Sequence, residues 1–216
     1  MIASYQLDCL NSFFNYTINK INTIIHLPYF TFKRDLCYNP LMIELMILFL
    51  LAKRELTMYS IHKNIEENFG AYSRPSFGAI KPALVRLEKN GCLTTRKMMS
   101  DGGKLSVYYS ITKTGLEELR KLILENLSEN PLQFLSNARV KLSCASYLSN
   151  EECAELFFHI KSMAMQHKYN AENIINNEYN QLSFYQRIIL DNAICEYSNF
   201  ITILEGLEKE NAGNRK

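Results

Sequence analysis

The feature that most constrains the fold is a change of hydrophobic period about two fifths of the way along the chain. Before it, apolar residues recur at steps of three and four, which is typical of helices; after it they alternate, which is typical of strands. The predicted helices span 41–54, 57–69 and 73–90, and the predicted strands span 93–98 and 105–111. Three helices followed by a two-stranded hairpin is the layout of a winged helix-turn-helix.

Turn and capping residues support these boundaries. Pro40 suits a first helical turn, and Thr57 can cap the second helix, which we expect to stop at Gly70. The sequence Ser-Asp-Gly-Gly at 100–103 is a strong hairpin turn between the two strands. Thr112 can cap a further helix that runs to about residue 126.

The C-terminal part reads as two long helices. Ser149, followed by acidic residues, predicts the start of the first, which we expect to reach about Gln181. The second spans about 184–209 and carries apolar residues at alternating steps of three and four, a heptad seam. The seam residues are Leu190, Ala193, Tyr197, Phe200, Leu204 and Leu207. One such seam must pack on another helix, so it predicts either a dimer interface, which we favour, or an intramolecular hairpin.

The N-terminal segment predicts a helix over about 4–26, ended by Pro28. Its apolar rows favour a core or dimer-seam helix; a membrane-surface helix fits less well because Lys20 is its one cation. The longest apolar run, 45–52, is far shorter than the roughly 20 residues that span a bilayer. With no convincing signal peptide, we expect no membrane partner and a cytoplasmic protein.

Composition argues against a catalytic or metal centre. The six cysteines are scattered without a C-x-x-C pair, so we expect reduced thiols and no structural metal site. The four histidines lack nearby nucleophiles or carboxylates at ligand spacing, and there is no glycine-rich phosphate loop. We therefore predict no cofactor and no enzyme.

Charge points instead to a nucleic-acid partner. The whole chain carries a formal charge of +2, yet residues 70–113 hold eight basic residues against two acidic ones, a net +6. Basic residues gather on the third helix and the hairpin, the two elements that meet double-stranded DNA in this architecture. The candidate DNA-binding residues are Tyr59, Ser73, Arg74, Ser76, Lys81, Val85, Arg86, Lys89, Arg96, Lys97, Lys104 and Tyr109.

Residues 41–124 resemble the PadR family of bacterial transcriptional regulators. The resemblance is carried by Met-Tyr-Ser-Ile at 58–61, by Lys-Pro-Ala-Leu-Val-Arg-Leu-Glu at 81–88, and by Val-Tyr-Tyr-Ser-Ile-Thr at 107–112 followed by Gly115. It departs at Lys81, where the family usually has Tyr, and at Met58, where it usually has Gly. The N-terminal extension is also atypical.

The resemblance implies a homodimer, held by C-terminal helices, that binds a palindromic operator, commonly as a repressor. In some relatives a small aromatic or drug-like compound releases the DNA, so a small apolar or aromatic effector is a further candidate partner. We expect a mainly α protein with a small β-hairpin, divided into an extension (1–36), a DNA-binding winged helix-turn-helix (37–127) and a helical dimerisation domain (128–216). The alternative is a winged-helix adaptor that binds protein, which the local +6 charge disfavours.

Overall fold

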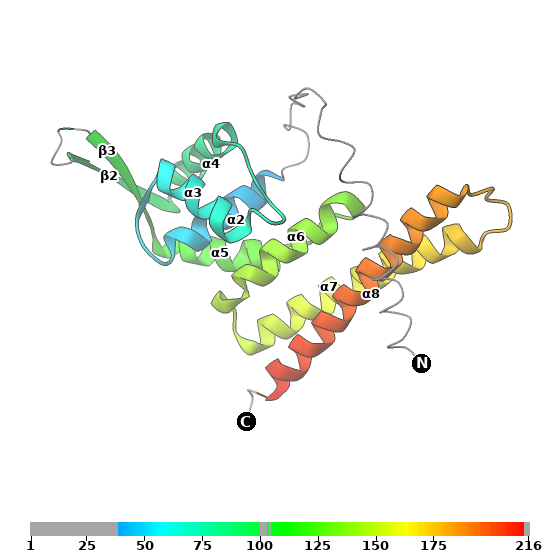
Figure 1. The fold of residues 1–216 in the computed structure, drawn as a ribbon. Helices are drawn as coiled ribbons and strands as arrows, with labels where there is room; N and C mark the ends of the chain where they lie inside the picture. The colour runs from blue at the N-terminus through cyan, green and yellow to red at the C-terminus, as the bar shows by residue number, and fades with distance from the viewer. Residues whose placement is uncertain (1–38, 100–102, 104, 214–216) are drawn as a thin grey trace, which may run out of the picture. The chain divides into compact units, whose positions relative to one another are not determined.

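The computed structural model describes residues 39–99, 103 and 105–213, which belong to one compact unit, Cys37–Lys216 (Figure 1). The helix predicted over 4–26 and the N-terminal extension lie outside the described residues. In chain order the elements are α2 (Pro40–Leu51), β1 (Leu56–Thr57), α3 (Met58–Phe69), α4 (Phe77–Lys89), β2 (Leu93–Met99), β3 (Leu105–Ile111), α5 (Lys113–Leu124), α6 (Pro131–Cys144), a 3₁₀ turn (Ala145–Tyr147), α7 (Asn150–Asn176) and α8 (Phe184–Gly213).

This order confirms the predicted winged helix-turn-helix and the mainly helical fold. One boundary shifts at α4, which begins at Phe77 and not at Ser73. Pro75 disfavours helical backbone in the residue before it, so the chain turns there and Ser76 becomes the N-cap. A second boundary shifts at the C-terminal end of α7, which stops at Asn176 and not at about Gln181.

The core is built around α2, of which ten of the twelve residues are buried. A helix that is apolar on all sides must be enclosed by other elements. Helices α3, α4, α5 and α6 all pack against it, and its side chains form one continuous cluster with theirs. The winged domain therefore shares its core with α6.

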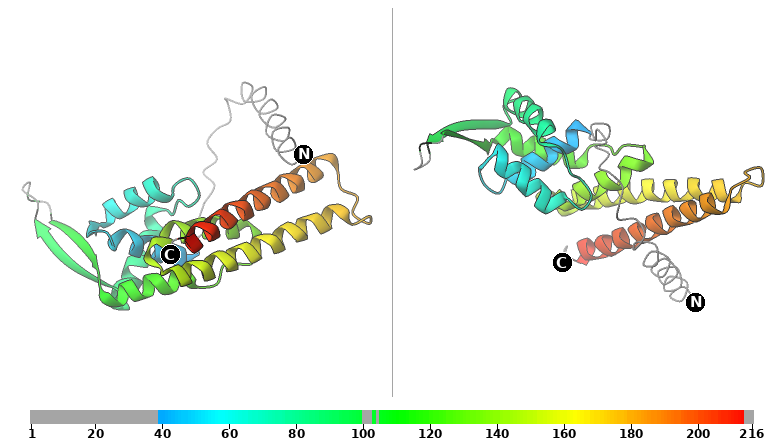
Figure 2. Two further views of the ribbon diagram at one scale, coloured as in Figure 1. Left: turned by 90° about the horizontal axis from the view of Figure 1, so that it is seen from below. Right: turned by 45° about the horizontal axis from the view of Figure 1, so that its top comes forward.

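The sheet has the strand order β1-β3-β2, with both pairs antiparallel. In the longer pair Leu93 is opposite Ile111 and Met99 is opposite Leu105. Beyond the short β1, the pair continues away from the helices as a two-stranded arm, the wing (Figures 1 and 2). Its base packs on the core through the buried Leu93 and the partly buried Tyr109 and Ile111.

The turn that leads into α5 depends on a close backbone approach. Thr112 caps α5 by accepting a hydrogen bond at Oγ1 from the Gly115 N–H at 3.0 Å, and its hydroxyl donates to the Gly91 carbonyl at 2.7 Å. A Cβ atom on Gly115 would lie 2.2 Å from the Cys92 carbonyl oxygen. Glycine at 115 therefore allows α5 to start against the end of the α4–β2 turn.

A buried lysine binds carbonyl groups at the C-terminal end of α5. The Lys141 side chain on α6 is fully buried, and its ammonium donates to the carbonyls of Leu122 at 2.8 Å, Ile123 at 3.0 Å and Glu125. These carbonyls belong to the last turn of a helix, which has no intrahelical donors for them. Burial lowers the pKa of Lys141 to about 8.

Helices α7 and α8 form a long antiparallel hairpin (Figures 1 and 2). The heptad seam of α8 faces inward: Tyr197, Phe200 and Leu204 are buried within this one chain. Tyr197 and Phe200 both pack on the ring of Phe134 of α6. For these three residues the intramolecular hairpin, the alternative to a dimer interface, is what the structure shows. Heptad spacing is the same in both cases, so the sequence pattern could not distinguish them.

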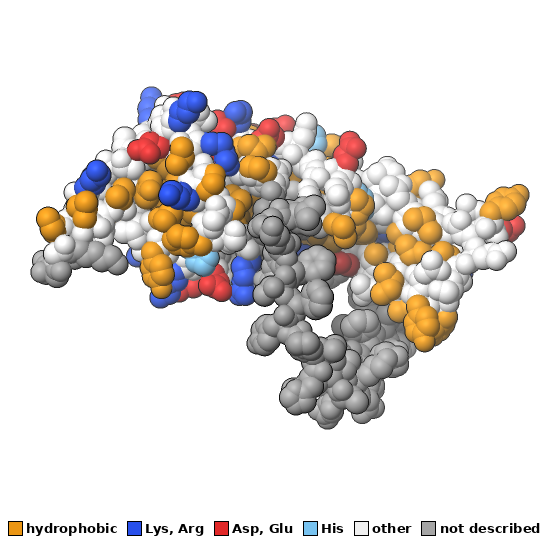
Figure 3. Space-filling model, turned by 90° about the horizontal axis from the view of Figure 1, so that it is seen from above, with side chains coloured by type: hydrophobic (Ala, Val, Ile, Leu, Met, Phe, Trp, Pro, Cys, Tyr) orange, Lys and Arg blue, Asp and Glu red, His pale blue; other side chains and the backbone are white. Residues whose placement is uncertain are grey.

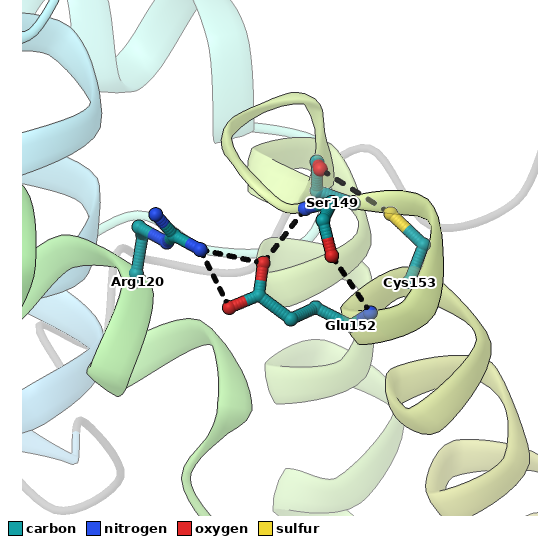
Figure 4. Close-up of polar contacts among 5 residues, drawn as sticks. Arg120, Ser149, Glu152 and Cys153 are labelled. Carbon is teal, nitrogen blue, oxygen red and sulfur yellow. Dashed lines mark hydrogen bonds and ion pairs between the residues drawn. The ribbon is translucent and has the colours of Figure 1, made fainter.

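The hairpin is joined to the winged domain by the start of α7. Ser149 and Glu152 form a capping box, the Ser149 Oγ accepting from the Glu152 N–H and the Glu152 carboxylate accepting from the Ser149 N–H at 2.7 Å (Figure 4). Arg120 of α5 donates to both oxygens of the same carboxylate, at 2.8 and 2.9 Å. These bonds hold the pKa of Glu152 below its usual value, the Ser149 N–H being the largest cause. Among the described helices, none is both long and apolar enough to cross a membrane.

Candidate nucleic-acid interface

Helix α4 has one buried face and one exposed face. Its buried residues are Ile80, Ala83, Leu84 and Leu87, which recur along one side of the helix. On the opposite face Lys81 and Lys89 are exposed, and Val85 is 55% exposed between them. Neither lysine forms an ion pair with any described residue. This face therefore offers two free cations around a small apolar side chain, on a helix fixed by its other side.

Two further exposed aromatic residues lie on α3 and in the first turn of α4. Tyr59 is among the most exposed aromatic side chains, with 71% of its surface accessible. Phe77, which the sequence analysis did not select, is also exposed and packs against the ring of His62 at 5.4 Å. The exposure of Phe77 could not be predicted from the sequence, because an aromatic residue at a helix start is normally part of the core.

Two of the predicted arginines are engaged inside the protein. The Arg86 Nε donates to Glu44 of α2 at 2.6 Å, and the Glu44 side chain is only 10% exposed. Arg96 donates to both carboxylate oxygens of Glu55, at 2.7 Å through Nε, and its guanidinium lies over the Tyr108 ring. The same pair raises the pKa of Arg96 and lowers that of Glu55. Both arginines hold elements together and are less available to phosphates than a free side chain.

The turn before α4 fits the prediction only in part. Ser73 is 6% exposed and its N–H donates to the Phe69 carbonyl at 2.8 Å, so its side chain does not reach the surface as predicted. Arg74 forms an ion pair with Glu66 at 3.2 Å, although more than half of its side chain remains exposed. Ser76 is exposed and makes no side-chain capping bond. The start of α4 therefore keeps a free hydroxyl beside its N–H groups.

On the wing, the two faces of the β2–β3 pair differ. Lys97 is exposed, whereas Tyr109 is half-buried and packs against the core, which raises its pKa. Tyr109 therefore belongs to the base of the wing and is not presented outward as predicted. Met98, Met99 and Leu105 are exposed toward the wing's end, an apolar feature that the sequence analysis did not select. Lys104 lies outside the described residues.

The structure thus exposes Lys81, Val85 and Lys89 on one face of α4, with Ser76 at its start, and it also exposes Tyr59 on α3. In Figure 3, Lys and Arg side chains are concentrated over the winged part, and apolar side chains dominate the end formed by the α7–α8 hairpin. The concentration of cations on this part suits a polyanion. Among the described residues, no group of three or more metal-ligating side chains occurs.

Comparisons with known proteins agree with this description. Residues 47–121 match the family described as "Transcriptional regulator PadR-like family". This range extends from the middle of α2 almost to the end of α5, which is the whole winged helix-turn-helix apart from the first turns of α2. No curated protein matches the chain.

Several solved structures are similar to the chain at low TM-scores. Bacillus subtilis PadR, solved in complex with operator DNA, is 21% identical, with 78% of this chain and 98% of that chain covered and a TM-score of 0.36. The protein smu.1604c from Streptococcus mutans UA159 is 23% identical over 76% and 96%, with a TM-score of 0.36. A PadR family regulator from hypervirulent Clostridium difficile R20291 is 26% identical over 37% and 80%, with a TM-score of 0.33.

The similarity rests on the match of residues 47–121, about a third of the chain, and on the fold of that same segment, with its buried α2, its exposed α4 face and its two-stranded wing. Through this winged helix-turn-helix segment, the chain is similar to the PadR-like family of transcriptional regulators.

Proposed function

We propose that the protein is a homodimer that binds double-stranded DNA in a sequence-specific manner and represses transcription from a palindromic operator. The observation that carries this proposal is the exposed face of α4, where Lys81 and Lys89 flank Val85 on a helix anchored by its opposite side. Such a helix can enter the major groove and bring cations to phosphates and a small side chain to base edges.

The neighbouring elements extend the same surface. Tyr59 on α3 and the Ser76 hydroxyl at the start of α4 are both exposed, and in this proposal they donate hydrogen bonds to phosphate oxygens. On the wing, Lys97 supplies a further cation. Arg86 and Arg96 act indirectly in this proposal, because their ion pairs with Glu44 and Glu55 fix α4 and the wing in place.

Dimerisation is proposed through the α7–α8 hairpin. Its inner seam is already filled, but large apolar side chains near the start of α8 remain exposed, among them Phe184, Tyr185 and Ile189. Clustered exposed apolar residues of this size favour a protein–protein contact. A two-fold dimer presents two α4 helices related by symmetry, which is why we propose a palindromic operator. In domain terms, residues 37–127 would bind DNA and 128–216 would dimerise.

The test is binding of the purified protein to DNA from just upstream of its own gene across a salt series. If each subunit neutralises about four phosphates, the dimer should lose affinity with a logarithmic salt slope of roughly −7. The double variant Lys81→Gln with Lys89→Gln should make the slope less steep by about 4 for the dimer, whereas Lys168→Gln on α7 should not change it. An unchanged slope in the folded double variant would remove α4 from the interface.

A second candidate is a winged-helix adaptor that binds protein. The exposed Met98, Met99 and Leu105 on the wing favour it, because DNA backbone contacts do not require apolar side chains there. One DNA-binding experiment distinguishes the two functions. Binding that is independent of DNA sequence and weak even at low salt would support the adaptor, and sequence-dependent binding would support the regulator.

A further inference from the structure

The wing carries two large apolar side chains next to each other at its outer end. Met99 of β2 is opposite Leu105 of β3 in the antiparallel pair, and the two residues are 68% and 57% exposed. Side chains of residues that are directly opposite point to the same face of a sheet and contact each other. Met99 and Leu105, the apolar pair, therefore form one exposed apolar projection on an arm that extends away from the helices (Figure 2).

The apolar pair lies on the face of the wing that turns toward α4. Side chains alternate between the two faces along a strand, so Thr95 and Lys97 share a face with Met99. The Thr95 hydroxyl donates to the Glu88 carboxylate of α4 at 3.0 Å. Tyr109, which is opposite Thr95, packs on the core. This face therefore meets α4 at its base and carries Lys97, and then the apolar pair, farther out.

The charge of the wing suits an anionic partner. Among the described residues of β2 and β3 none is acidic, whereas Arg96 and Lys97 are basic. Lys97 is exposed and forms no ion pair with any described residue. A partner of this face must therefore combine negative charge with an apolar surface. Duplex DNA does so in its minor groove, where phosphates border base steps between which apolar side chains can insert.

The opposite face of the wing provides a reference. Met98 is opposite Ser106 and is 42% exposed, so this face has a single apolar side chain at its outer end. Arg96, on the same face, is bound to Glu55 and lies over the ring of Tyr108. The cation on this face is thus engaged inside the protein. The combination of an unpaired cation with two adjacent apolar side chains belongs to the α4 side of the wing.

We propose that the apolar pair enters the minor groove next to the site of α4, partly unstacks one base step and bends the duplex, while Lys97 contacts the adjoining phosphates. This inference rests on the proposed function. Apolar side chains that insert in this way kink DNA by about 20–90°. The cost depends on the base step, and pyrimidine–purine steps are the most easily unstacked. The wing thereby selects an operator by its deformability, at a position where no hydrogen bond to a base is required.

The test uses a duplex from just upstream of the protein's own gene, with a donor dye at one end and an acceptor dye at the other. We expect binding of the full chain to shorten the end-to-end distance and to raise the energy transfer. The double variant Met99→Ser with Leu105→Ser should bind this duplex without bending it and about tenfold more weakly, with an unchanged salt slope because no phosphate contact is lost. Met98→Ser is the matched control on the opposite face and should bend the duplex as the unmodified protein does.

Lys97→Gln separates the charge from the apolar contact. Removing one phosphate contact from each subunit should make the salt slope of the dimer less steep by about 2, while the bend persists. All the substituted side chains are exposed, so the circular dichroism spectra of the variants should match that of the unmodified protein.

Sequence-dependent binding without a bend, or a bend that survives the double variant, would overturn the insertion and leave the proposed function standing. If the chain binds no DNA at any salt concentration, the proposed function fails and the insertion fails with it. Vesicles that contain phosphatidylserine test another anionic surface. Binding to them that the double variant loses, together with an unbent duplex, would assign the apolar pair to a lipid surface and overturn the proposal.

Discussion

At the scale of single residues, the winged domain depends on a few positions where no other side chain fits. Gly115 is one of them. It is the residue that lets α5 begin against the Cys92 carbonyl, and Thr112 caps the helix three residues before it. The Thr-x-x-Gly spacing that contributed to the family resemblance therefore has a packing reason in this chain.

Gly115→Ala should destabilise the protein by about 1–3 kcal/mol, because the new Cβ would meet a backbone oxygen that cannot move without shifting the α4–β2 turn. Urea unfolding followed by circular dichroism measures this. Gly206→Ala is the control: its Cβ meets nothing within 4 Å inside α8, so it should stabilise by up to about 1 kcal/mol. Equal effects of the two changes would contradict the packing explanation.

His167 should make stability depend on pH. Its pKa in the folded protein is lowered by burial from the ordinary value of 6.5. Below that value the unfolded chain binds the proton more readily than the folded one, so stability should fall as the pH drops from 7.5 to 5.5. His167→Phe should lose this part of the pH dependence, and His159→Gln, at an exposed position of α7, should retain it. Parallel pH curves for the protein and His167→Phe would exclude the effect.

At the scale of elements, α4 is held by more than its apolar face. Arg86 reaches across to Glu44 in the middle of α2, so the helix that we propose for DNA recognition is tied to the most buried helix of the domain. The wing has a comparable tie through Arg96 and Glu55. Residues that looked like phosphate ligands in the sequence thus set the orientation of the elements that carry other ligands.

Arg86→Ala should therefore lower the stability by about 1–3 kcal/mol, because the nearly buried Glu44 carboxylate loses its partner. Lys89→Ala, which removes an unpaired cation from the same helix, should change stability by no more than about 0.5 kcal/mol. Chemical denaturation compares the two directly. Combining Glu44→Gln with Arg86→Ala should recover part of the loss; no recovery would show that the pair does not couple the two helices.

At the scale of the whole molecule, the described part of the chain leaves a large apolar surface at the start of α8. We expect Phe184→Ser combined with Ile189→Ser to convert the proposed dimer to a monomer in sedimentation velocity, since both side chains are about 70% exposed in the single chain. Leu132→Ser on α6, which is 87% exposed, is the control and should leave the dimer intact. A dimer that persists in the α8 variant would place the interface elsewhere.

The sequence by itself determined the order, type and approximate bounds of the winged elements α2 to α5 and of the two long helices α7 and α8, but it indicated neither β1 nor α6. These depend on periodicity, caps and turn residues, which act between residues a few positions apart. Only the tertiary structure decided the partners of the selected side chains. Arg86 and Glu44 are 42 positions apart in the sequence, and Arg96 and Glu55 are 41 apart. No local sequence pattern could therefore predict either ion pair. The heptad seam of α8 likewise predicts that an apolar surface packs on it, but not whether that surface belongs to the same chain or to a second copy. In the structure it packs on α7 and on Phe134 of the same chain.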